Sequence, residues 1–152
     1  MITSYLVLKF LHVLFVVVAV GFNLSYGFWL ARARKDPKSL PFVLKNIKVM
    51  DSFVANPAYA GLAITGPLMV WMNGYSWNAF WIWMSALLLV LAAVLGIVVY
   101  SPLLKRQIAA LEQKGPDSAE YKALEARATG LGVGLCGLVA VILFLMVAKI
   151  QF

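Results

Sequence analysis

A long uninterrupted apolar run near the N-terminus limits the possible folds of this chain more than any other feature. Residues 5–30 read YLVLKFLHVLFVVVAVGFNLSYGFWL. The run is longer than the roughly 20 apolar residues that a helix needs to cross the hydrocarbon core of a bilayer. No cleavage site of small residues follows a short apolar region, so the run predicts a retained transmembrane helix rather than a signal peptide.

Three further apolar runs follow, and only 12% of the 152 residues are charged, against about 25% in soluble domains. The four predicted spans cover about residues 6–30, 53–73, 79–100 and 129–148. Helical spacing continues past the third span to Leu111, and Asp117 or Ser118 followed by Glu120 is a helix N-cap signature. The sequence therefore predicts an all-α fold: one integral membrane domain over residues 1–152, a four-helix bundle with cytoplasmic helical extensions.

Positive charges are divided unevenly among the connections. Eleven of the thirteen Lys and Arg residues lie between the first and second spans or between the third and fourth, and the link at residues 74–78 has none. Loops rich in Lys and Arg stay on the cytoplasmic side. We therefore expect a multi-pass protein of the cell inner membrane with both termini outside. The net charge of +7 then points to the membrane surface rather than to nucleic acid.

The segment between the first two spans combines basic and apolar residues. Its cations are Arg32, Arg34, Lys35, Lys38, Lys45 and Lys48. Leu40, Leu44 and Ile47 share one helical face with Val43 and Met50. This pattern resembles an amphipathic helix on anionic lipid head groups. The alternative is a plain connector carrying ordinary cytoplasmic charges.

Nearly all polar groups of the first run fall on one arc of a helical wheel. The arc contains Tyr5, Lys9, His12, Val16, Ala19, Asn23, Tyr26 and Gly27. Lipid cannot hydrogen-bond these groups, so the arc should face other helices or a cavity. One interpretation is a packing face; the other makes His12, the only histidine, a metal or haem ligand or a proton carrier. His12, Lys9, Asn23 and Tyr26 are the candidate cofactor-binding residues, and His12 is the candidate metal ligand.

The remaining signals concern packing. Pro67 should bend the second span, because its ring removes a backbone donor. Gly130, Gly134 and Gly137 share a face of the fourth span, which would let another helix approach closely or leave a slot for a flat ring. The single cysteine, Cys136, cannot form an intramolecular disulfide and is best explained as a small packing residue.

Several short motifs are similar to those of a bacterial family of four-helix integral membrane proteins of unassigned function. They are KFLH from Lys9, DSFVANP from Asp51, TG at Thr65, YSPLLKRQ from Tyr100 and EY at Glu120. The resemblance covers nearly the whole chain and implies its fold. It implies no activity.

The first run also resembles, more distantly, the first helix of HemJ-type protoporphyrinogen oxidases and of CopD-type membrane proteins. The likeness lies in KFLHVLFVV, residues 9–17. In the HemJ-type family the histidine of this element is implicated in haem binding, so the resemblance implies that role for His12. It covers about one helix and implies no other residue.

Two functions from different classes fit these observations, and the sequence leaves open whether the protein is an enzyme. The first is a redox-linked membrane protein that binds haem b at His12, with Met69, Met72 and Met84 as candidate second ligands. The second is a non-enzymatic helical subunit that scaffolds or regulates a larger membrane complex, or that associates with copies of itself.

Overall fold

The computed structural model describes residues 3–151, and these form helices joined by short links, without a strand. The elements are α1 (Ser4–Ala33), α2 (Leu40–Met50), η1 (Asp51–Ala55), α3 (Asn56–Asn73), α4 (Phe80–Val94), η2 (Leu95–Tyr100), α5 (Ser101–Lys114) and α6 (Ala119–Ala148). The η elements are π-helical segments that join α2 to α3 and α4 to α5 without a break. The result is four long helical rods, each long and apolar enough to cross a membrane. The predicted all-α membrane bundle is confirmed.

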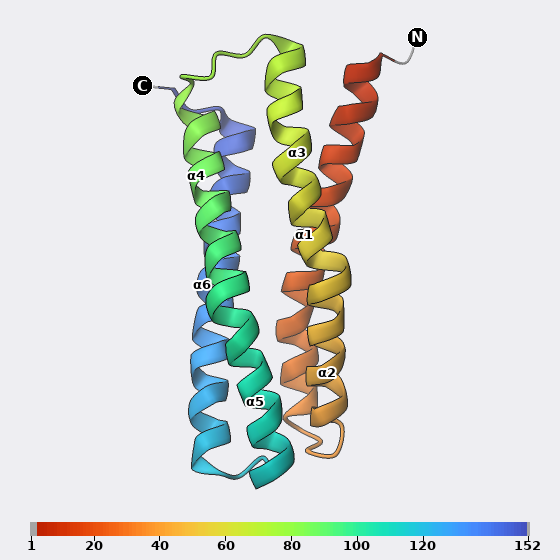
Figure 1. Ribbon diagram of the computed structural model, residues 1–152, viewed down its shortest axis with the longest axis vertical. Coiled ribbons are helices and arrows are strands. Elements are labelled where there is room, and N and C mark those ends of the chain that lie inside the picture. Colours follow the sequence, from red (N-terminus) through yellow and green to blue (C-terminus); the bar gives the residue numbers. More distant parts are fainter. Residues whose placement is uncertain (1–2, 152) are drawn as a thin grey trace.

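The rods run alternately up and down (Figure 1). Helix α1 packs mainly against α3, and α4 packs mainly against α6. The links at residues 34–39 and 115–118 lie together at one end of the bundle. The link between α3 and α4 lies at the other end, beside the two ends of the described chain (Figure 1). Both basic connections therefore share one end, which we call the basic end.

The tightest apolar core lies toward the basic end. Leu44, Leu104 and Tyr121 are at most 2% exposed, and Leu40, Ile47 and Leu111 surround them. These residues come from α2, α5 and α6. Burying apolar surface away from water contributes about 25 cal/mol per Å² of stabilisation. Helices surrounded by lipid gain no hydrophobic stabilisation when they pack together. Core packing is thus expected where the rods extend toward water.

This core corrects one interpretation of the sequence. The apolar face of residues 40–50 packs against α1 and α5 instead of lying on a leaflet. The second rod begins at Leu40, ahead of the predicted span at residues 53–73, and its first three turns form α2. An amphipathic pattern predicts an apolar neighbour without identifying it, and here the neighbours are α1 and α5. The predicted helical extensions of the third and fourth spans are present, because α5 continues the third rod to Lys114 and α6 begins at Ala119.

Proline explains where the π-helical segments occur. Pro57 lies at the start of α3 and Pro102 at the start of α5, each directly after a π-helical segment. A proline has no N–H, and its ring collides with the carbonyl four residues earlier. That carbonyl belongs to Phe53 in η1 and to Val98 in η2. Widening the preceding turn relieves the collision and keeps each rod continuous.

The turn at the basic end follows the sequence signals. Gly115 adopts φ 80°, a left-handed value that glycine tolerates, and ends α5. The Ser118 hydroxyl accepts a hydrogen bond from the Tyr121 amide at 3.3 Å and caps α6. The predicted N-cap is therefore confirmed at Ser118.

Candidate functional site

The middle of the polar arc of α1 faces α3, in agreement with the prediction that the arc faces other helices. Ala19 is fully buried at the centre of the arc. The His12 ring nitrogen Nδ1 lies 2.7 Å from the Thr65 hydroxyl, and the Asn23 amide donates to the Tyr59 hydroxyl at 2.6 Å. We call this contact the α1–α3 seam. His12 and Asn23 thus each pair with a side-chain hydroxyl of α3.

Glycine lets the two helices of the α1–α3 seam approach closely. A Cβ atom at Gly61 would lie 2.6 Å from the Phe15 ring, well inside van der Waals contact. A Cβ atom at Gly66 would lie 3.7 Å from Cε1 of His12, an ordinary contact distance. Gly61 is therefore the position where a side chain does not fit, and it sets the depth at which α1 rests on α3.

The hydrogen bonds around Thr65 determine which His12 nitrogen carries a proton. The Thr65 hydroxyl donates its single hydrogen to the Gly61 carbonyl at 2.7 Å. The bond between His12 and the same hydroxyl then requires His12 Nδ1 to be the donor. In a neutral imidazole this tautomer leaves the lone pair on Nε2. The hydrogen-bond chain from His12 through Thr65 to the Gly61 carbonyl thus leaves the Nε2 lone pair available to bind a metal or accept a proton.

The other candidate site residues lie apart from His12. Lys9 is exposed and Tyr26 is 6% exposed within the core near the basic end. Because α1 is continuous, Asn23 and Tyr26 lie about 16 and 21 Å from His12 along its axis. The Tyr26 hydroxyl is buried without a hydrogen-bond partner. The structure therefore places His12 and Asn23 on one seam at different depths, and it does not gather the four residues.

A polar cluster around Lys48, in the second rod, was not predicted from the sequence. The Lys48 ammonium donates to Ser101 at 2.6 Å and to Ser52 at 3.2 Å, which joins α2 to the start of α5. The nearby half-buried Asp51 interacts electrostatically with Lys48. Ionisable groups within membrane helices are costly and often functional. The available signal was that the DSFVANP and YSP motifs each combine polar residues with a proline.

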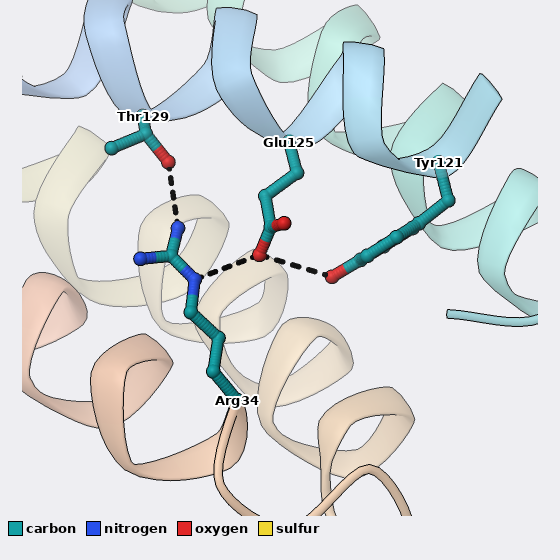
Figure 2. Close-up of polar contacts among 4 residues, drawn as sticks. All are labelled: Arg34, Tyr121, Glu125 and Thr129. Atoms are coloured by element: carbon teal, nitrogen blue, oxygen red, sulfur yellow. Dashed lines mark hydrogen bonds and ion pairs between the residues drawn. The ribbon is translucent and has the colours of Figure 1, made fainter. Parts of the chain in front are cut away.

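Four residues join the end of α1 to α6 near the basic end (Figure 2). Arg34 Nε contacts a Glu125 carboxylate oxygen at 2.8 Å, and its Nη2 donates to Thr129 at 2.9 Å. Tyr121 donates to the same Glu125 oxygen at 3.5 Å. We call Arg34, Glu125, Thr129 and Tyr121 the clasp. Glu125 is therefore part of a specific contact between α1 and α6.

The glycine face of α6 points away from the rest of the chain. Gly130, Gly134 and Gly137 are exposed, and a Cβ atom at any of them would meet nothing within 4 Å. Gly132, on the opposite side of the helix, faces Tyr100. No other part of residues 3–151 covers this face, so the close approach of another helix, or a slot for a flat ring, stays a prediction. Periodicity showed that the glycines share a face but not where that face points.

Comparison with known proteins supports membrane insertion and assigns no activity. No curated protein and no solved structure matches the chain. The likeness of the first helix to HemJ- and CopD-type proteins therefore stays an expectation. A family model described as predicted integral membrane protein (DUF2269) matches residues 6–150. The chain accordingly belongs to this family of predicted integral membrane proteins.

Proposed function

We propose that this integral membrane protein binds haem b through Nε2 of His12. The observation that carries the proposal is the His12–Thr65–Gly61 hydrogen-bond chain, which places the proton on Nδ1 and the lone pair on Nε2. Haem-ligating histidines use a neutral ring nitrogen while the other nitrogen donates to a fixed acceptor. When bound, haem supplies reversible one-electron redox chemistry.

The donor set fits a haem ligand better than a multi-ligand metal site. Among the described residues, no group of three or more His, Cys, Asp or Glu side chains could hold a metal ion. A single histidine suffices for haem, because the porphyrin supplies four nitrogen ligands itself. His12 is half-buried between α1 and α3, where Thr65 holds its ring in one orientation. Of the candidate second ligands, Met72 is 43% exposed, while Met69 and Met84 are half-buried.

The test is a reduced-minus-oxidised absorbance spectrum of the full chain, purified in mild detergent after expression with ample haem. We expect a Soret band in the purified protein and its loss in His12→Ala. The matched control is Asn23→Ala, which removes the other side-chain bond of the α1–α3 seam and should keep the band. A folded protein that stays colourless on titration with haem would refute haem binding and favour the role of a helical subunit in a membrane complex.

We further propose that the protein lies in the inner membrane with both termini outside. Both basic connections lie at one end of the bundle (Figure 1), and the link at the other end has no Lys or Arg. This arrangement is what the positive-inside rule requires of a four-span protein. The cations at residues 32–48 would then face the anionic head groups of the cytoplasmic leaflet.

A further inference from the structure

A hollow between the third and fourth rods combines apolar walls with two arginines. Its volume is about 460 Å³. Its apolar walls are formed by Val98, Val99, Pro102, Leu103 and Leu131, and Arg106 and Arg127 complete the lining. We call this hollow the arginine groove. His12 does not line it, so its role is independent of haem binding.

Neither arginine of the groove is neutralised by this chain. Among residues 3–151, neither guanidinium has an ion pair or a side-chain hydrogen bond. All four carboxylates of the α5–α6 hairpin pair with other cations: Glu112 with Lys45, Asp117 with Lys122, Glu120 with Lys114, and Glu125 with Arg34. Two neighbouring positive charges are thus left without a counter-ion at the same hollow.

The groove lies at the level where the apolar spans end. Val98 and Val99 are 65% and 44% exposed and belong to the third span. Arg106 lies about 9 Å beyond the last residue of that predicted span, Tyr100. Arg127 lies about 3 Å outside the start of the fourth predicted span at Thr129. With the predicted span boundaries, the walls would face lipid chains and the arginines would lie at the depth of the head groups.

We propose that the arginine groove binds one anionic phospholipid, with its phosphate on Arg106 and Arg127 and an acyl chain along the apolar walls. Guanidinium groups bind phosphate oxygens in a planar, two-pronged geometry. Basic pockets between membrane helices on the cytoplasmic side are a recurrent site for anionic head groups. The sequence alone does not single out these two arginines, because the pairing of the neighbouring carboxylates is not visible in it.

The experiment measures lipid binding to the delipidated full chain by native mass spectrometry, titrating phosphatidylglycerol or phosphatidylcholine in mild detergent. We expect phosphatidylglycerol to bind more tightly. Replacing both groove arginines, Arg106→Gln with Arg127→Gln, should weaken that binding about thirtyfold, from the loss of two interfacial charges. The charge-matched control, Lys9→Gln with Lys149→Gln, removes two exposed cations near the opposite end of the bundle and should leave the affinity unchanged.

A second variant tests the apolar walls. Leu131→Trp fills the groove without altering charge and should also weaken phosphatidylglycerol binding, while circular dichroism reports an intact fold. If the groove double variant and the control double variant weakened phosphatidylglycerol binding equally, the proposal would be overturned in favour of non-specific electrostatic attraction. Equal affinity for phosphatidylcholine would overturn it as well. Competition by inorganic phosphate at the same concentration as the lipid would show that the site takes a free anion.

Discussion

The guanidinium of Arg34 lies 2.8 Å from the carboxylate of Glu125, although 91 residues separate them in the chain. This contact joins the end of α1 to α6, two rods that otherwise pack mainly against α3 and α4. Thr129 and Tyr121 add hydrogen bonds on either side of the pair (Figure 2). The clasp therefore holds the two helix pairs together near the basic end.

The clasp should stabilise the bundle modestly. The Arg34 and Glu125 side chains are 44% and 22% exposed, so solvent screens their attraction. We expect a coupling free energy of about 0.5–1 kcal/mol in a double-mutant cycle of Arg34→Met and Glu125→Gln. The measurement is the free energy of unfolding in mild detergent. The Lys122–Asp117 pair is the control, because its Asp117 side chain is 96% exposed and its coupling should be close to zero. Equal coupling in both pairs would contradict a structural role for the clasp.

Gly61→Ala should destabilise the α1–α3 seam. The new methyl group would lie within 3 Å of three ring atoms of Phe15, so the ring or the helix has to move. Overpacking of this kind costs about 1–3 kcal/mol. The measurement is the midpoint of thermal unfolding, and a smaller side chain in Phe15→Leu should recover part of the loss.

Gly134→Ala is the matched control for this substitution, because a methyl group there meets nothing within 4 Å. It should leave the midpoint unchanged or raise it slightly through higher helix propensity. If Gly134→Ala were as damaging as Gly61→Ala, the outward face of α6 would be covered by another chain.

Substitutions of Thr65 test the proposed His12 tautomer, with haem affinity as the measured quantity. Thr65→Val keeps the shape of the side chain and removes the oxygen that accepts from His12 Nδ1. Loss of such a supporting partner typically lowers ligand affinity about 10–100-fold. Thr65→Ser keeps the hydroxyl and should bind haem as the wild type does. Equal haem affinities of all three proteins, measured by titration of the Soret band, would rule out a role for Thr65.

The sequence predicted what depends on periodicity and failed where the result depends on the position of one rod against another. Four spans, the polar arc of α1 and the Ser118 cap follow from local pattern. The pairing of His12 with Thr65 depends on how α1 is aligned along α3, which a single sequence does not encode in any short motif. The outward direction of Gly134 and the burial of Leu44 against α5 likewise depend on how the helices are placed against one another. In each case the pattern identified a face correctly and left its neighbour undetermined.

The proposed orientation predicts opposite labelling of the two ends of the bundle on intact cells. In a Cys136→Ala background, Ser76→Cys places a thiol in the exposed uncharged link, and Asp117→Cys places one at a side chain that is 96% exposed at the basic end. An impermeant thiol reagent should label Ser76→Cys and leave Asp117→Cys unlabelled until the membrane is permeabilised. Because both positions are exposed, a difference between them reports sidedness rather than burial. Labelling of Asp117→Cys alone on intact cells would reverse the orientation and place the eleven clustered cations outside, against the positive-inside rule.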